Sequence, residues 1–331
     1  MTPSKSISPI AATVAFAAAA VLAAPVPAFA DRMFVSNEKD QTVSVIDTAK
    51  MEVIHTIKTG NRPRGIMLAN DNKWLLLCAS DDNRVEVYDT KTYELVKTLP
   101  SGPDPELFTL HPSGNPLYIA NEDDNIVTVV DIHTNKILAE VPVGVEPEGM
   151  GMSPDGRYVV NTSETTNMAH FIDTKTYEAT ANILVDNRPR VAEFKPDGSE
   201  VWVSAEIGGT VAVIDPASKT VKAKFGFEIQ GISKDAIQPV GVRFTRDGAK
   251  AYVALGPSNR VAVVDAKTYK VEKYILVGQR VWNLAFTPDG KQIYTTNGTS
   301  NDVTVIDVAT DKAIKSIKVG RYPWGVVGLA D

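Results

Sequence analysis

Short runs of β-branched and aromatic residues alternate with turn residues along most of the chain, and one pattern recurs throughout. A β-rich run ends in an aspartate seven times, at intervals of 42 residues except for one interval of 50. The aspartates are Asp47, Asp89, Asp131, Asp173, Asp215, Asp265 and Asp307. A period of this length is typical of a four-stranded propeller blade. The repeat therefore predicts an all-β protein, in which these aspartates form turns.

Each repeat divides into four predicted strands. The first strand follows a proline and ends in a turn such as residues 153–156 (SPDG), where proline and glycine preset the backbone angles. The second strand closes in a polar residue, as at residues 118–121, and the third strand ends in the aspartate. The fourth strand runs toward a glycine, as in residues 137–144. No segment has a convincing helical period.

The order of the strands predicts how the ring closes. The seventh copy of the repeat's first strand, residues 323–330, ends the chain. Residues 33–37, in contrast, open the repeat region directly with a second strand. We therefore predict a seven-bladed β-propeller in which the C-terminal strand pairs with the N-terminal strands. Closure of this kind leaves no long open sheet edge.

The N-terminus has the pattern of a secretory signal peptide. Lys5 precedes an apolar stretch from Ile10 to Ala24, and small residues follow up to Ala30. The apolar stretch is shorter than the roughly 20 residues that a spanning helix needs. We predict that residues 1–30 are removed on export, that residues 31–331 form a single domain, and that no membrane span remains after cleavage.

The second strands approach the sequence YVTN, at residues 34–37 (FVSN), 118–121 (YIAN) and 294–297 (YTTN). Together with a VGxxPxG pattern and the SPDG turns, they resemble the YVTN-repeat β-propeller family over residues 31–331. Within that family the chain most resembles secreted propellers associated with pyrroloquinoline-quinone-dependent alcohol and amine catabolism in Gram-negative bacteria. The resemblance implies a periplasmic accessory or binding protein that acts beside a quinoprotein dehydrogenase. It does not imply that this chain holds the quinone.

Composition and motifs argue against several other classes. The net charge of −6 gives no basic footprint for nucleic acid. The single cysteine, Cys78, lies in an apolar run and is predicted to be a core residue. None of the four histidines has a second ligand at metal-binding spacing, and no hydrolase or phosphate-binding motif is present. We expect a monomer without cofactor, metal or catalytic residue. A metal-dependent, lactonase-like hydrolase with scattered ligands and a cell-surface adhesion module remain as alternatives.

Residues around the repeat proline predict the functional surface. These connections meet on one face of the disc, around the mouth of the central channel, and the only insertion lies in the connection 225–238. Loops on a rigid scaffold commonly carry binding residues, arginine suits carboxylate or phosphate, and tryptophan anchors interfaces. We predict that this mouth, overhung by residues 225–238, binds a small anionic ligand or a partner protein. The predicted binding residues are Arg62, Arg64, Arg188, Arg190, Arg280, Trp282, Arg321 and Trp324.

Ion pairing between blades is the alternative role for some of these arginines. In register, Arg64 faces Glu106 and Arg190 faces Glu148. The register offers no acidic partner to Arg280 or Arg321, which are therefore expected to be free for a ligand.

Overall fold

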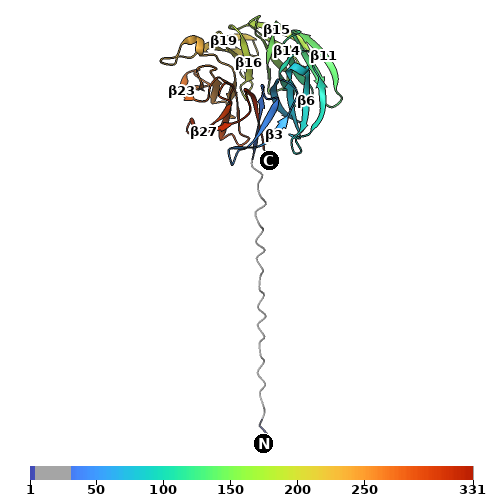
Figure 1. Ribbon diagram of the computed structural model, residues 1–331, viewed down its shortest axis with the longest axis vertical. Helices are drawn as coiled ribbons and strands as arrows, with labels where there is room; N and C mark the ends of the chain where they lie inside the picture. Colours follow the sequence, from blue (N-terminus) through green and yellow to red (C-terminus); the bar gives the residue numbers. More distant parts are fainter. Residues whose placement is uncertain (4–30, 331) are drawn as a thin grey trace.

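Seven four-stranded antiparallel sheets stand around a central axis in the computed structural model, which describes residues 1–3 and 31–330 (Figure 1). The predicted all-β, seven-bladed propeller is confirmed. The apolar stretch and cleavage site of the predicted signal peptide lie outside the described residues. Among the residues described, no helix is long and apolar enough to cross a membrane.

The four strands of each blade follow one another from the channel to the rim. Blade 1 contains, in this order, β28 (Pro323–Leu329), β1 (Arg32–Asn37), β2 (Thr42–Asp47) and β3 (Glu52–Lys58). Blade 2 contains β4 (Pro63–Ala69), β5 (Trp74–Ala79), β6 (Arg84–Asp89) and β7 (Leu95–Pro100). Blade 3 contains β8 (Pro105–Leu110), β9 (Leu117–Asn121), β10 (Ile126–Asp131) and β11 (Lys136–Pro142). Blade 4 contains β12 (Pro147–Met152), β13 (Tyr158–Ser163), β14 (Met168–Asp173) and β15 (Glu178–Leu184).

The remaining blades follow the same order. Blade 5 contains β16 (Pro189–Phe194), β17 (Val201–Ala205), β18 (Thr210–Asp215) and β19 (Thr220–Gly226). Blade 6 contains β20 (Val242–Phe244), β21 (Lys250–Ala254), β22 (Arg260–Asp265) and β23 (Val271–Leu276). Blade 7 contains β24 (Val281–Phe286), β25 (Gln292–Asn297), β26 (Asp302–Asp307) and β27 (Lys312–Lys318). Two short 3₁₀ turns, η1 (Ser80–Asp82) and η2 (Lys234–Ala236), complete the described elements.

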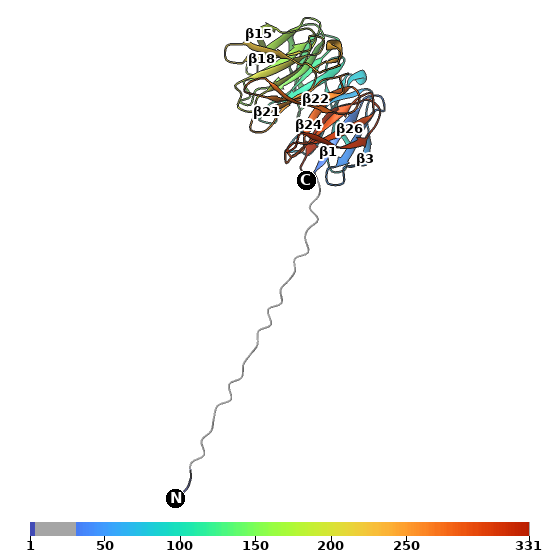
Figure 2. The same cartoon turned by 90° about the vertical axis from the view of Figure 1, so that its left-hand side faces the viewer.

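Blade 1 joins the two ends of the ring as predicted. Strand β28 runs antiparallel to β1, with Val326 opposite Val35 and Gly328 opposite Met33. Figure 2 shows the N-terminal strands and the C-terminal strands side by side in this blade. The closing strand comes from the opposite end of the sequence, so the ring is held shut by backbone pairing.

The hydrophobic core is divided among the spaces between neighbouring blades. Between blades 2 and 3, for example, Leu76 and Cys78 from β5 pack with Phe108 and Ile119 from β8 and β9. Cys78 is fully buried, which confirms its predicted place in the core. The outermost strands are mostly exposed, with one buried residue each in β3, β11 and β27, so the blades meet one another mainly through their inner strands.

The second-strand motif has a structural role in the described blades. Its asparagine fastens the second strand to the third: Asn297 donates from Nδ2 to the Thr304 hydroxyl at 2.9 Å. Its hydroxyl residue fastens one blade to the next, because Thr296 donates to the carbonyl oxygen of Trp324 at 2.7 Å. The aspartates that end the third strands cap turns, as predicted. Asp131, for example, accepts from the backbone N–H of His133 at 2.8 Å.

Candidate functional site at the channel mouth

The backbone at the channel mouth repeats closely around the ring. Six residues that precede a first strand adopt a left-handed conformation, with φ between 50° and 59°: Arg62, Asp104, Glu146, Arg188, Arg280 and Tyr322. Left-handed non-glycine residues are uncommon in proteins, but in this chain they also occupy turns away from the mouth, such as Asn135 and Tyr177, so they reflect the repeated turn geometry. A neighbouring asparagine holds five of the six mouth residues in place. Asn167, for example, accepts from the backbone N–H of Arg188 at 3.0 Å, and equivalent asparagines serve the others.

Arg62 and Arg64 meet at one carboxylate. Arg62 contacts Glu106 at 3.1 Å and also pairs with Asp104. Arg64 pairs with the other oxygen of Glu106, so the predicted contact between blades 2 and 3 is confirmed. Burial alone would lower the pKa of Arg64, but the surrounding carboxylates, Glu106 first among them, raise it overall. Both guanidinium groups are therefore committed to carboxylates of the protein.

Arg190 is the most buried arginine of the mouth and contacts three glutamates. Its Nη2 lies 2.8 Å from Glu148, which confirms the second predicted ion pair. Its Nη1 lies 2.5 Å from Glu164 and 3.4 Å from Glu206. Side-chain exposure is 4% for Arg190, 2% for Glu148 and Glu164, and 4% for Glu206, so these charges are shielded from water.

The expectation that Arg280 and Arg321 lack acidic partners is wrong. Arg280 lies 2.8 Å from Glu206, two blades away along the chain, and its guanidinium lies 4.2 Å from the centre of the Trp282 ring. Arg321 pairs with Asp40 at 2.5 Å in an exposed turn. Both acidic partners lie in turns that follow second strands. The prediction compared only residues of first strands, so it did not include these turns.

The two predicted tryptophans occupy different environments. Trp282 is partly exposed beside Arg280, whereas Trp324 is only 1% exposed. Trp324 lies under Arg64, whose guanidinium carbon is 4.8 Å from the ring centre. Its position fits a packing role in the channel wall better than direct contact with a large partner.

Four glutamates at the mouth are absent from the predicted binding residues. Glu38, Glu122, Glu164 and Glu206 each directly follow a second strand, and they contribute much of the negative charge there. Three of them pair with the predicted arginines, whereas Glu122 makes no ion pair within the described residues. The sequence does contain a pattern that points to them, because the position directly after the second strand is glutamate in four of seven repeats.

Negative charge is concentrated between blades 3 and 4. Carboxylate oxygens of Glu122, Glu146 and Glu164 lie within 4.8 Å of one another, and those of Asp104, Glu106 and Glu122 form a second such group. Neither Glu122 nor Glu146 has an ion-pair partner among the described residues, although Glu146 accepts a hydrogen bond from Thr165. Burial raises the pKa of Glu164 to about 7, against the opposing effect of Arg190 and with a further increase from Glu148. Both groups could supply oxygen ligands to a cation.

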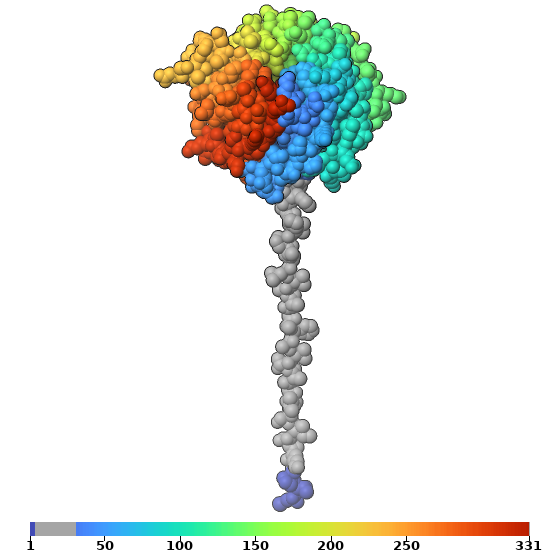
Figure 3. Space-filling model, viewed as in Figure 1, coloured from blue at the N-terminus to red at the C-terminus, as the bar shows by residue number. Residues whose placement is uncertain are grey.

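The insertion lies mostly beside the channel mouth, which corrects the predicted overhang. Phe227 and Ile237 are buried in the core cluster of blades 5 and 6, and a hollow of about 520 Å³ separates the insertion from residues 207–210. The gold loop in Figures 1 and 3 projects outward from the edge of the disc. Only its end reaches the mouth, where the Gln238 amide oxygen accepts from Arg280 at 3.0 Å.

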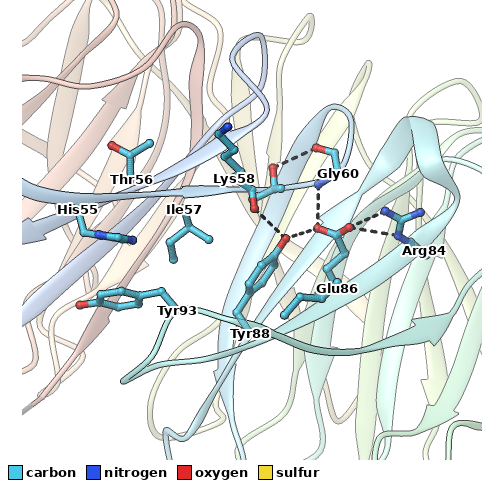
Figure 4. A pocket seen from close by; sticks show the side chains of 11 residues that line it. His55, Thr56, Ile57, Lys58, Gly60, Arg84, Glu86, Tyr88 and Tyr93 are labelled. Carbon is cyan, nitrogen blue, oxygen red and sulfur yellow. Dashed lines mark hydrogen bonds and ion pairs between the residues drawn. The ribbon is translucent and has the colours of Figure 1, made fainter.

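A separate hollow of about 420 Å³ lies between the outer parts of blades 1 and 2 (Figure 4). Its central carboxylate, Glu86, accepts from the Tyr88 hydroxyl at 2.6 Å, from Arg84 at 2.7 Å and from the Gly60 backbone at 2.9 Å. His55 stacks on Tyr93 at its edge, with 4.6 Å between ring centres. Because the Glu86 carboxylate already accepts three hydrogen bonds from the protein, this hollow is a weaker candidate for a ligand-binding site than the mouth is.

Family comparisons agree with the propeller architecture. Residues 28–146 match the model "Lactonase, 7-bladed beta-propeller", and residues 123–286 match the model "Choice-of-anchor I domain". Each match spans less than half of the 331-residue chain. Comparison of the sequence with curated proteins gives no significant match. The resemblance to the YVTN-repeat family and to propellers of quinone-dependent catabolism stays a prediction.

Solved structures with the same fold come from proteins of diverse descriptions. Hydrazine synthase from Kuenenia stuttgartiensis is 20% identical, with a TM-score of 0.76 over 90% of this chain and 100% of that one. A putative 6-phosphogluconolactonase from Bacteroides uniformis is 16% identical, with a TM-score of 0.76 over 91% and 100%. The dihydro-heme d1 dehydrogenase NirN is 14% identical, with a TM-score of 0.68 over 89% and 74%. At these identities the comparisons establish the fold alone, a seven-bladed β-propeller.

Proposed function

We propose that this chain is an exported binding protein whose channel mouth docks a basic surface of a periplasmic partner. A quinoprotein dehydrogenase is the candidate partner, which follows from the family resemblance in the sequence. The proposal keeps the predicted location of the site and changes the expected charge of what it binds. A small anion is disfavoured because the mouth arginines already pair with carboxylates of the protein.

The observation that carries the proposal is a surplus of carboxylates held on a repeated, rigid backbone. Glu122 and Glu146 lie beside Glu164, between the arginines of blade 2 and those of blade 5. Neither Glu122 nor Glu146 has a counter-ion among the described residues. Complementary charge steers association and fixes the orientation of a complex. Lysine or arginine side chains of a partner would supply the missing cations.

The test is binding of the purified mature chain to a purified quinoprotein dehydrogenase by biolayer interferometry at several salt concentrations. The double variant Glu122→Gln, Glu146→Gln removes the unpaired charge while keeping side-chain shape. We expect at least tenfold weaker binding and a shallower salt dependence. The matched control is Glu140→Gln, Glu178→Gln on exposed outer strands, which should bind as the original protein does.

Equal binding by the two double variants, with both folded, would place the docking surface elsewhere. Failure of the unaltered chain to bind at any salt concentration would remove this partner. Both results are informative because the circular dichroism melting curve of each variant shows independently whether the propeller is intact.

A lactonase-like hydrolase is the second candidate, favoured by the match of residues 28–146 to a propeller lactonase model. The carboxylate groups at the mouth would then hold a divalent cation. Lactone hydrolysis that is abolished by a chelator and restored by added calcium would support this function in place of docking. The cell-surface module stays a prediction, and release by osmotic shock would argue against it.

A further inference from the structure

The channel wall is built in layers that follow the repeat. We count the repeat proline or its equivalent as position one. Position two, at the charged mouth, then carries Arg64, Glu106, Glu148, Arg190, Val240, Trp282 and Trp324. Position five carries Met67, Thr109, Gly151, Glu193, Arg243, Ala285 and Val327, one from each blade. Only two of these seven side chains are charged, and they stand on neighbouring blades.

All seven position-five residues line one cavity of about 360 Å³. The cavity also includes Pro154, from the turn after β12, which places it at the end of the channel opposite the charged mouth. Most of the remaining wall is apolar, with Phe108, Met150 and Val326 among the contributing side chains. Its volume falls within the range of small-molecule sites, which are mostly apolar with a few placed polar groups.

One ion pair is the main polar feature of this chamber. Arg243 Nη1 lies 3.0 Å from a carboxylate oxygen of Glu193 and donates to the backbone oxygen of Val242 at 2.8 Å. Within the described residues, Nε and Nη2 of Arg243 make no hydrogen bond. The Arg243 side chain is 35% exposed and that of Glu193 is 27% exposed, so both face the hollow.

We propose that this chamber binds a small monocarboxylic acid with an apolar body, held by the free Nε and Nη2 edge of Arg243. Two parallel N–H donors in one plane match the two oxygens of a carboxylate, which is the geometry that arginine provides and lysine does not. The apolar wall takes the body of the ligand out of water. The proposal is independent of docking at the opposite mouth.

An acid fits this chamber better than an amine. An amine would need the Glu193 carboxylate as its acceptor, but that carboxylate already accepts from Arg243, whereas Nε and Nη2 of Arg243 make no hydrogen bond within the described residues. Glu193 competes with an incoming carboxylate for Arg243, so its neutral replacement should help an acid and weaken an amine. The two ligand classes therefore make opposite predictions for one variant.

The experiment uses octanoate, octanol and octylamine as probes, titrated calorimetrically into the mature chain at neutral pH. We expect octanoate to bind at least tenfold more tightly than octanol, and octylamine not to bind. Arg243→Met should weaken octanoate at least tenfold, and Glu193→Gln should strengthen it severalfold. The control Arg246→Met alters an exposed arginine of the same face that contacts Pro288, and it should change nothing.

Methyl signals of the methionines give a readout at the site itself. In ¹³C-methyl spectra, octanoate should shift Met67, Met150 and Met152, which line the chamber, and leave Met51, which packs between blades 7 and 1, unchanged. If Arg243→Met fails to fold, Arg243→Lys is the second variant. It keeps the positive charge but lacks the two parallel N–H donors of the guanidinium, so it should bind octanoate less tightly. The proposal is overturned if octanoate does not bind, if it shifts only other methionines, or if Glu193→Gln weakens it.

Discussion

Replacing Arg190 by methionine is the sharpest test of the buried charge network. The guanidinium contacts Glu148, Glu164 and Glu206, and all four side chains are at most 4% exposed. Arg188 and Arg280 still reach Glu164 and Glu206 in the variant. Glu148 is left without an ion pair to any described residue, because Arg190 is its only partner.

The expected cost is large because a buried charge loses its counter-ion. Removing one partner of a buried ion pair typically costs about 3–5 kcal/mol, since the remaining carboxylate stays out of water. For a chain of this size that corresponds to a fall in melting temperature on the order of 10 °C. Methionine keeps most of the side-chain volume, so little of the loss should come from a cavity.

The deficit should depend on pH with a defined sign. The pKa of Glu164 in the folded protein is about 7, above the ordinary glutamate value of 4.5, and loss of Arg190 would raise it further. A carboxyl whose folded-state pKa is raised contributes stability that is present below its unfolded pKa and is lost as pH rises through the folded value. Relative to the unaltered protein, Arg190→Met should therefore be least destabilised near pH 4.5 and most destabilised above about pH 7.

The assay is thermal unfolding followed by circular dichroism across this pH range. Arg321→Met is the matched control, because it removes the same side chain from an exposed pair with Asp40 and should cost within about 1 kcal/mol. Adding Glu148→Gln to Arg190→Met should recover part of the loss, because it removes the carboxylate that the variant leaves without an ion pair to any described residue. Melting temperatures within a degree for the two arginine variants at pH 8 would refute the buried-network account.

Three further predictions concern export, closure and packing. N-terminal sequencing of protein released by osmotic shock should begin at Asp31, and retention of the first thirty residues would contradict export. Deleting residues 320–331 removes β28 and leaves β1 unpaired, so cooperative unfolding should be lost; an unchanged melting curve would contradict the closure. Gly149→Ala places a methyl group against the backbone of blade 5 and should lower the melting temperature by several degrees. Gly226→Ala, with only an ordinary contact at 3.4 Å, is its control and should change it little.

The fold was predictable because a local pattern carries nearly all of the information. The interval of 42 residues gives the size of a blade, the seven copies of the repeat give the number of blades, and proline, glycine and aspartate mark turns with fixed backbone geometry. Closure followed from counting strands, since a first strand at one terminus and a second strand at the other can pair in the same blade. The insertion was located correctly, but its direction depends on where Phe227 and Ile237 find apolar partners, which the repeat does not specify.

The charged site was only partly predictable because its partners come from different positions of the repeat. Pairs between equivalent positions of adjacent blades, Arg64 with Glu106 and Arg190 with Glu148, follow directly from the register. Arg280 instead pairs with Glu206, which follows a second strand. In a closed ring, side chains from first strands and from these turns converge on the same narrow mouth. Comparison of equivalent first-strand positions therefore does not reveal glutamates that follow second strands, such as Glu164 and Glu206.

The same geometry explains why the two ends of one channel differ so strongly in character. Each position of the first strand defines a ring of seven side chains at one depth, so a single substitution changes one seventh of one layer and leaves the strand pairing intact. The second layer contains four charged residues and two tryptophans, whereas the fifth contains one charged pair among mostly small or apolar residues. Because backbone pairing maintains the ring independently of these side chains, a docking surface and an apolar chamber can exist on the same seven strands. Substitution can therefore change the side chains at one end of the channel without altering those at the other.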